Sequence, residues 1–130
     1  MIQDWDDAYT NGAYIADGES YPAKWEALAQ AFRDKMPVEG RAELDLRYGP
    51  AARERLDLFR PAGAAKGLAI FVHGGYWMKF DKSSWSHLAA GALQRGWAVC
   101  LPGYTLAPEA RIADIVRQVA SAIRFAADRV

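Results

Sequence analysis

The chain has 130 residues, of which 52% are hydrophobic and 25% are charged, and its acidic and basic side chains balance to a formal net charge of zero. This composition is typical of a globular domain and excludes an intrinsically disordered chain. A net charge of zero gives no electrostatic attraction to nucleic acid. No apolar run approaches the roughly 18 residues of a transmembrane helix. We therefore predict a protein that binds neither nucleic acid nor membranes.

Cysteine and histidine usage bounds the compartment and the cofactors. The single cysteine, Cys100, lies in an apolar run, so we interpret it as an inert buried thiol. The acidic segment at residues 1–7 lacks the basic and then apolar pattern of a secretory signal, which favours a cytoplasmic protein. The two histidines, His73 and His87, have no carboxylate at ligand spacing, so we expect no metal site and no cofactor.

The first 40 residues are predicted to be a helical segment. Trp5 and Tyr9 have a spacing that suits a short helix, and Pro22 is typical of a helix start. Pro37 and Gly40 are expected to end that second helix. Its predicted apolar side consists of Trp25, Leu28, Ala29 and Phe32.

Residues 42–61 show the period-two pattern of β-strands. Leu44 and Leu46 alternate with charged residues, and after a turn Leu56 and Leu58 flank Asp57. We predict a two-stranded antiparallel unit at the edge of a sheet.

Two continuous apolar runs follow, at residues 68–72 and 97–101, and both are typical of strands covered on two faces. Between them we expect a helix that Ser83 or Ser84 caps and that ends before Gly96. Its predicted apolar stripe consists of Trp85, Leu88, Ala89, Ala92 and Leu93. A strand, helix and strand in this order predict a right-handed crossover and a parallel strand pair.

Residues 111–130 have apolar positions at helical spacing and predict a long amphipathic helix. The element order gives an α/β fold with a mixed, mostly parallel sheet flanked by helices. In a parallel sheet the last helix should lead to another strand, which these residues do not contain.

The most informative segment is the sequence His-Gly-Gly-Tyr-Trp at residues 73–77, directly after an apolar strand. Ligands in open α/β sheets gather at the carboxyl ends of strands. Gly74 and Gly75 allow a sharp turn that points amide N–H groups into a cleft, where they can stabilise an oxyanion. Taken alone, two glycines are better explained as an ordinary tight turn. A phosphate-binding loop is excluded because no Gly-Lys-Ser/Thr or Gly-x-Gly-x-x-Gly pattern follows the strand.

This segment resembles the His-Gly-Gly loop of the hormone-sensitive-lipase-like branch of α/β hydrolases. Its Tyr-Trp continuation is most similar to the arylformamidase (kynurenine formamidase) group and related esterases. Tyr-Thr-Leu-Ala-Pro-Glu at residues 104–109 resembles a second segment of the same branch, and Trp-Asp-Asp-Ala-Tyr at residues 5–9 resembles its aromatic N-terminal cap. We therefore predict a partial α/β-hydrolase domain over residues 1–130, with the cap at 1–40 and the first sheet elements at 41–130.

The resemblance implies a role for each residue of the loop. The backbone N–H groups of Gly75 and Tyr76 would be the oxyanion donors, and Gly74 would permit the turn. His73 would brace the loop and would not be the catalytic base. Tyr76 and Trp77 either line the substrate pocket or pack against the protein, and the sequence favours neither. The neighbouring loop would be held by Tyr104 and Pro108.

The catalytic residues of such an enzyme are not found here. The Gly-x-Ser-x-Gly elbow that carries the nucleophile is missing, and in this fold the acid and the histidine follow it. We interpret Ser83, Ser84 and Ser86 as capping and helix-surface residues. The segment with Lys79, Asp81 and Lys82 is interpreted as a solvated loop.

Two functions remain open. The chain is either the oxyanion-hole side of a serine hydrolase that cleaves a small ester or N-formyl amide, or a non-catalytic module for binding and oligomerisation. The first hypothesis predicts a small-molecule substrate and a complementary C-terminal segment. The second predicts a homo-oligomer or a complex, because a half-sheet would expose an apolar edge.

Overall fold

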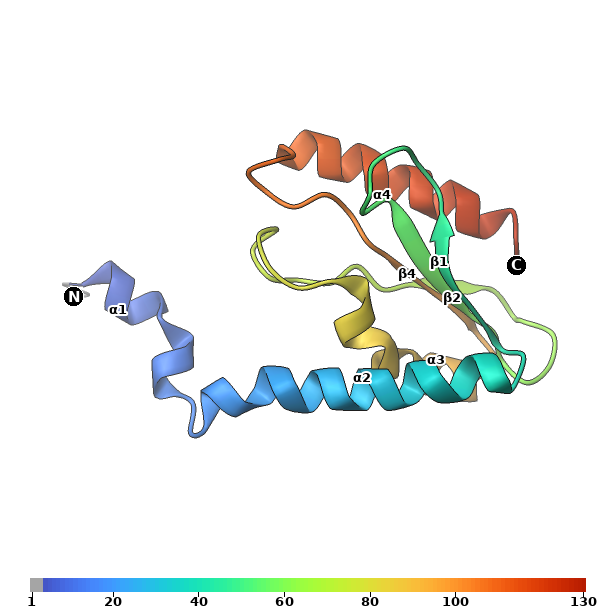
Figure 1. Ribbon diagram of the computed structural model, residues 1–130, viewed down its shortest axis with the longest axis horizontal. Coiled ribbons are helices and arrows are strands. Elements are labelled where there is room, and N and C mark those ends of the chain that lie inside the picture. The colour runs from blue at the N-terminus through green and yellow to red at the C-terminus, as the bar shows by residue number, and fades with distance from the viewer. Residues whose placement is uncertain (1–3) are drawn as a thin grey trace.

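A mixed four-stranded sheet with the order β1-β2-β4-β3 forms the centre of the computed structural model, which describes residues 4–130 (Figure 1). Strands β1 (Ala42–Arg47) and β2 (Arg55–Phe59) are antiparallel, and β2 is antiparallel to β4 (Ala98–Pro102). Strand β3 (Leu68–Ile70) lies at the other edge, parallel to β4. The predicted α/β class, the antiparallel unit at the sheet edge and the parallel pair are confirmed.

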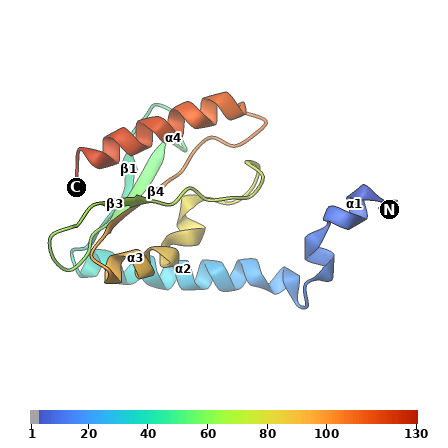
Figure 2. The same ribbon diagram turned by 180° about the vertical axis from the view of Figure 1, so that it is seen from behind.

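Helices cover the two faces of this sheet. Helix α2 (Tyr21–Val38) and helix α3 (Ala90–Gln94) lie on one face, and α4 (Ile112–Ala127) lies on the other (Figure 2). The core is split accordingly: Val99 and Leu101 of β4 pack towards α2, whereas Cys100 packs with Leu58 towards α4. Burial raises the pKa of Cys100 to about 12, so this residue is the inert thiol that its apolar run predicts.

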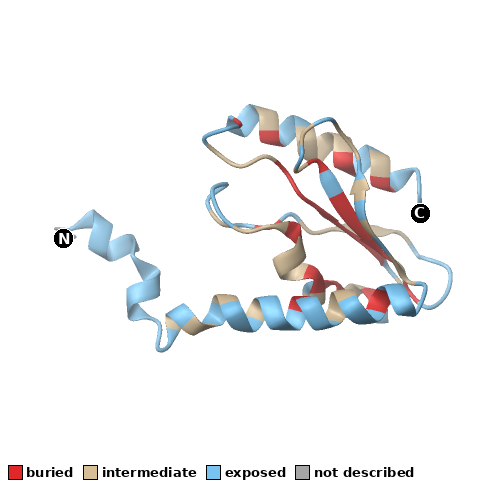
Figure 3. Cartoon of the chain, viewed as in Figure 1, coloured by how far each residue is buried: buried red, intermediate tan, exposed pale blue. Residues whose placement is uncertain are grey.

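The segment before α2 forms short helices that project from the rest of the chain. They are α1 (Trp5–Tyr9), followed by the 3₁₀ turns η1 (Asn11–Tyr14) and η2 (Gly18–Ser20). Figure 3 shows this segment almost entirely exposed, and Trp5 and Tyr9 keep 59% and 68% of their surface. The short helix at Trp5 is confirmed.

Helix α2 differs in detail from its prediction. Leu28, expected on the apolar side, is exposed, whereas Ala29 and Met36 are buried. Pro37 lies inside the last turn, and the helix ends at Val38. Gly40 then adopts a left-handed φ of +67°, the usual conformation after a helix end.

The helix after β3 begins earlier than predicted and is mostly 3₁₀: η3 spans Lys82–Ala89 and α3 continues it. Its cap is Asp81, whose carboxylate accepts a hydrogen bond from the Ser83 N–H at 3.1 Å. The prediction that Ser83 or Ser84 caps the helix is therefore wrong. Ser86 was expected on the helix surface but is fully buried, and Leu88 was expected in the apolar stripe but is exposed.

A buried ionic cluster joins α2, β1, β2 and η3. Its centre is the fully buried Asp57, which pairs with Arg33 and, at 2.9 Å, with the Lys82 ammonium. Lys82 also pairs with Asp45 at 2.6 Å, which holds the pKa of Asp45 below its usual value. The interpretation of Lys82 as a solvated residue is wrong: charges are buried only when they are paired, and this pairing fixes η3 to the sheet.

Helix α4 confirms the predicted amphipathic helix over a slightly shorter range. Ala122 and Ala126 are buried against the sheet, and Ile115 is buried in a cluster with Tyr104 and Ala110. Val116 and Ile123 keep 61% and 41% of their surface. Within the described residues, no helix is both long and apolar enough to span a membrane.

Candidate active site

The loops that follow β3 and β4 meet at the carboxyl ends of the two parallel strands. The Tyr104 hydroxyl donates a hydrogen bond to the His73 carbonyl oxygen at 2.7 Å. Further along both loops, the Ala107 N–H donates to the Trp77 carbonyl oxygen at 2.8 Å. The structure therefore brings together the two segments that the sequence singled out, residues 73–77 and 104–109.

The backbone of the first loop is unusual. Gly75, Tyr76 and Trp77 have φ values of +116°, +52° and +59°, a region that non-glycine residues rarely occupy. The Met78 and Lys79 N–H groups close the turn by donating to the Gly75 carbonyl oxygen, at 3.0 and 3.1 Å. Such strain persists only where surrounding contacts impose it, and it concentrates at functional sites.

Glycine is required at only one of the two adjacent positions. A Cβ atom on Gly75 would lie 2.6 Å from the Lys79 carbonyl oxygen and 2.9 Å from the Phe80 ring. A Cβ atom on Gly74 would meet no atom within 4 Å. The turn that the sequence analysis linked to Gly74 therefore depends on the conformation of Gly75.

The amide groups of this loop have no acceptor within the chain. Across residues 4–130, none of the N–H groups of residues 73–77, those of Gly75 and Tyr76 included, donates a hydrogen bond to another group. Adjacent donors in a fixed backbone, placed where a strand ends, are what the stabilisation of a developing oxyanion requires.

His73 is held as part of the scaffold. Its ring is buried and stacks on the Tyr104 ring with centroids 4.5 Å apart. Its Nδ1 lies 2.8 Å from the Gly74 carbonyl oxygen, which can only accept, so Nδ1 carries the proton. Burial lowers the pKa of His73, because it disfavours the charged ring. These contacts favour the bracing role over proton transfer.

Of the remaining predicted residues, Tyr76, Trp77 and Pro108 lie at the surface of the two loops, whereas Tyr104 is buried. Tyr76 and Trp77 keep 76% and 49% of their surface, so neither is packed into the described core. With Met78, also exposed, they give the tip of the loop an apolar surface, as a pocket wall requires. Pro108 is exposed and follows Ala107 through a cis peptide bond, while Tyr104 is fully buried.

Sequence reasoning missed two supports of the loop. An aromatic cluster of Trp25, Phe80 and Trp85 connects α2 to the end of the loop, with centroid distances of 5.1 to 6.5 Å. Arg53, in the turn before β2, donates to the carbonyl oxygens of Phe80 and Tyr104. Helical spacing could have suggested the aromatic cluster, but nothing distinguishes Arg53 from the other arginines of this polar stretch.

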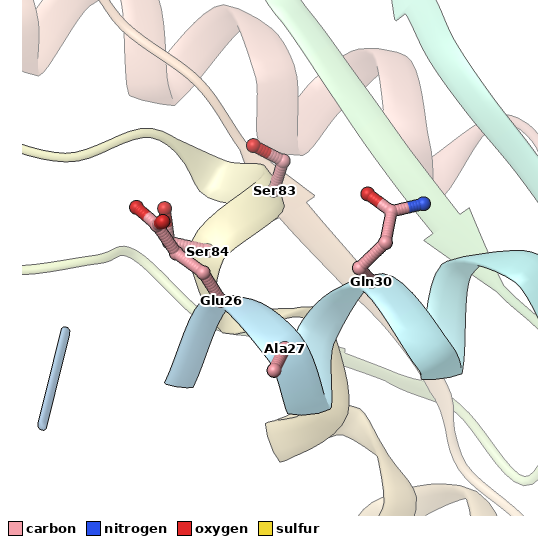
Figure 4. Close-up of a pocket in the computed structure, with 5 residues that line it drawn as sticks. All are labelled: Glu26, Ala27, Gln30, Ser83 and Ser84. Atoms are coloured by element: carbon pink, nitrogen blue, oxygen red, sulfur yellow. The ribbon is translucent and has the colours of Figure 1, made fainter. Parts of the chain in front are cut away.

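A separate depression of about 360 Å³ lies between α2 and η3 (Figure 4). It is lined by Glu26, Ala27, Gln30, Ser83 and Ser84. No residue of the 73–77 loop reaches it, and its lining includes no histidine that could activate a serine hydroxyl. We therefore do not assign it as the active site.

The described residues contain no cluster of histidine, cysteine or carboxylate side chains that could hold a metal ion. They contain a four-stranded mixed sheet and, after β3, a strained loop whose backbone N–H groups have no acceptor. The class of protein that this fold defines is the α/β hydrolases. Residues 56–130 match the family model described as BD-FAE, and the chain belongs to the BD-FAE family.

Known relatives agree with this assignment. Kynurenine formamidase of Danio rerio is 36% identical over 78 residues, which cover 58% of this chain and 27% of that protein. A solved structure from Silicibacter sp. TM1040, provisionally named a thioesterase, is 53% identical and superposes with a TM-score of 0.91 over 95% of this chain and 47% of that chain.

Esterase B from Lactobacillus rhamnosis shares the fold, with a TM-score of 0.60 and 19% identity over 79% of this chain and 39% of its own. This chain thus spans less than half the length of each of these proteins.

Proposed function

We propose that this chain supplies the oxyanion-hole side of a serine hydrolase that cleaves a small ester or N-formyl amide. The observation that carries the proposal is the strained loop at the carboxyl end of β3, whose N–H groups, those of Gly75 and Tyr76 among them, have no acceptor within residues 4–130. The serine, acid and histidine would come from a segment that continues the sheet beyond these residues.

In the proposed reaction an activated serine hydroxyl attacks the substrate carbonyl, and its proton passes to the catalytic histidine. The carbonyl oxygen becomes negative and accepts hydrogen bonds from Gly75 and Tyr76. One such donor is worth roughly 3–4 kcal/mol of transition-state stabilisation. His73 takes no part in proton transfer, since it is buried and its ring stacks on Tyr104 of the second loop.

The substrate class rests on the surface beside the donors and on the relatives. Tyr76, Trp77 and Met78 offer an exposed apolar and aromatic surface next to the two N–H groups. This surface suits a small aromatic or acyl group. The Danio rerio relative is a kynurenine formamidase and the Lactobacillus relative an esterase, which supports an N-formyl aromatic amide or a short-chain ester as the substrate.

The partner that completes the sheet would bind at β3. Leu68, Ala69 and Ile70 pair with β4 on one side, and no other strand within residues 4–130 pairs with β3. Helix α4, which covers one face of this sheet, also exposes the apolar side chains of Val116 and Ile123. We favour a complementary hydrolase segment as the occupant, because it would also supply the missing serine.

The test is intact mass spectrometry before and after treatment with a fluorophosphonate serine probe. It is applied to this chain alone and to the protein that carries this chain with its sheet-completing segment. We expect one label on the completed protein, hydrolysis of an N-formyl aromatic amide or a short ester, and no label on the chain alone. Absence of label from the completed protein would overturn the enzyme proposal.

The unpaired edge of β3 also supports the second candidate, a non-catalytic binding module. That function predicts association of this chain with itself, measurable by sedimentation velocity at increasing concentration. A concentration-independent monomer would exclude the homo-oligomer. Self-association without any probe-reactive protein would favour the module over the hydrolase.

A further inference from the structure

Arg53 lies on a turn that is fixed by its own contacts. In this turn, which joins β1 to β2, the Tyr48 N–H donates to the Glu54 carbonyl oxygen at 3.0 Å, and the Ala51 N–H donates to the Glu54 carboxylate at 2.6 Å. The Tyr48 hydroxyl donates to the Gly103 carbonyl oxygen at 2.6 Å, which ties the turn to the end of β4. Glu54 is buried. Arg53 therefore extends from a rigid platform.

The guanidinium group of Arg53 contacts both loops of the candidate active site. Its Nε donates to the Tyr104 carbonyl oxygen at 2.8 Å, and its Nη2 donates to the Phe80 carbonyl oxygen at 2.8 Å. Nη2 also lies 3.1 Å from the Asp81 carboxylate. Burial alone would raise the pKa of Asp81, but the Ser83 N–H and the charges of Lys82 and Arg53 outweigh it and hold that pKa low.

Tyr104 and Arg53 together hold both ends of the strained loop. Tyr104 holds the start of the loop, through its hydroxyl on the His73 carbonyl oxygen. Arg53 holds the end, through the carbonyl oxygen of Phe80, whose φ is +72°. Arg53 also fixes the backbone of Tyr104 itself. Gly75 and Tyr76 thus lie between two fixed positions, His73 and Phe80, and Arg53 contributes to fixing both.

We propose that Arg53 is a positioning residue, which keeps the Gly75 and Tyr76 N–H groups in the geometry that binds the oxyanion. The role in catalysis rests on the proposed function; the clamping of the loop does not. Arginine suits this task because its planar fork directs several N–H groups at fixed angles. A lysine would keep the charge but could not reach the two carbonyl oxygens and the Asp81 carboxylate in the same directions.

Hydrogen exchange of single amides, followed by NMR on this chain, tests the clamp. The reporters are the amides of Met78, Lys79 and Ala107, which are hydrogen-bonded within or across the two loops. In R53K we expect these amides to exchange about tenfold faster, because hydrogen bonds to a charged donor are lost. The amides of Leu58 and Cys100, which face each other in the two central strands β2 and β4, should exchange as in the wild type.

The matched control is R41K. Arg41 also donates to a backbone carbonyl oxygen, that of Arg60 at 3.1 Å, and pairs with the Glu39 carboxylate at 3.0 Å, but these partners lie outside the turn that carries Arg53 and outside the active-site loops. We expect R41K to leave the exchange of the three reporter amides unchanged. Equal acceleration in R41K and R53K, or no acceleration in a folded R53K, would overturn the proposal.

If R53K unfolds, exchange rises at Leu58 and Cys100 as well, and D81N becomes the deciding variant. An amide oxygen at this position still accepts from the Ser83 N–H, so the cap of η3 is kept, while the charge that faces Arg53 is removed. We expect faster exchange at the same three reporters with a smaller amplitude than in R53K. Unchanged exchange in D81N would then overturn the proposal.

Kinetics separate positioning from general stability. In the completed hydrolase, R53K should lower kcat about tenfold and change KM less than about twofold, because an oxyanion contact acts mainly in the transition state. A raised KM with unchanged kcat would contradict this role. If the completed protein shows no hydrolase activity at all, the proposed function fails, and hydrogen exchange still decides whether Arg53 clamps the loop.

Discussion

Strands β3 and β4 have the same kind of sequence and very different surroundings. Both are continuous apolar runs, yet every residue of β4 is buried, while β3 is short and each of its residues is only half-buried. Strand β4 lies between two strands and between two layers of helices, whereas β3 lies at the edge of the described sheet. An apolar run therefore predicts that both faces of a strand must be buried. The tertiary structure shows whether other elements of the described chain bury them.

The loops after these two strands also differ, in burial and in backbone strain. The loop after β4 begins with the fully buried Tyr104, whereas the loop after β3 carries the positive φ values and the exposed Tyr76 and Trp77. The loop on the well-packed strand therefore supports the loop that has the candidate chemistry. The predictions below test this division, from the largest expected effect to the smallest.

The largest effect is expected from a core truncation in β4. Leu101 is 1% exposed and packs in the cluster that contains Phe59 and Val99, so L101A should lower the free energy of unfolding by about 3 kcal/mol. The matched change in β3, L68A, removes a half-buried side chain and should cost about 1 kcal/mol. Urea denaturation of both variants measures the difference. Equal losses would show that β3 is as well covered as β4.

A pair of glycine substitutions tests the strained loop. G75A places a Cβ atom 2.6 Å from a carbonyl oxygen at a φ of +116°, so we expect a loss of about 2 kcal/mol in stability. In the completed hydrolase, kcat should fall by about 100-fold or more. G74A meets no atom within 4 Å and should be close to the wild type in both measurements. A larger effect of G74A than of G75A would show that the turn depends on Gly74 and not on Gly75.

Removal of one hydroxyl group tests the contact between the loops. Y104F loses the buried hydrogen bond to the His73 carbonyl oxygen and leaves that oxygen without its donor, at an expected cost of about 1–2 kcal/mol. The control Y76F removes the hydroxyl of a side chain that is 76% exposed and should leave the melting temperature unchanged. If both variants melt like the wild type, Tyr104 does not hold the two loops together.

The smallest effect concerns pH. Burial lowers the pKa of His73, so the unfolded chain takes up a proton that the folded chain does not. The free energy of unfolding should therefore decrease as the pH falls below about 6.5, the ordinary histidine pKa. The lowered pKa values of Asp45 and Asp81 act in a separate window, below about pH 4.

Thermal melts of the wild type and of H73Q between pH 7 and pH 5 measure the His73 contribution. H73Q should flatten the decrease, because glutamine does not titrate in this range. His87, whose pKa burial also lowers, remains in both proteins and accounts for any residual slope. An identical slope in the two proteins would show that His73 does not carry the dependence.

Much of the fold follows from local patterns. Alternation in β1, the apolar runs of β3 and β4 and the helical spacing of α4 each determine an element, because side-chain periodicity reports which faces must be buried. The errors lie where a charged or polar residue enters the core. Asp57 reads as the outward position of an alternating strand and Lys82 as part of a polar loop, but each is buried by pairing with the other.

The sequence by itself determined the α/β class, the parallel pair and the two motif segments, since periodicity, turn residues and motif spacing are local properties of the chain. Only the tertiary structure decided that Gly75 is the strained glycine, that Tyr104 clamps His73 and that Arg53 bridges both loops. These contacts join residues far apart in the chain. Their strength comes from the orientation of a few donors and acceptors in a partly buried site, which no local pattern encodes.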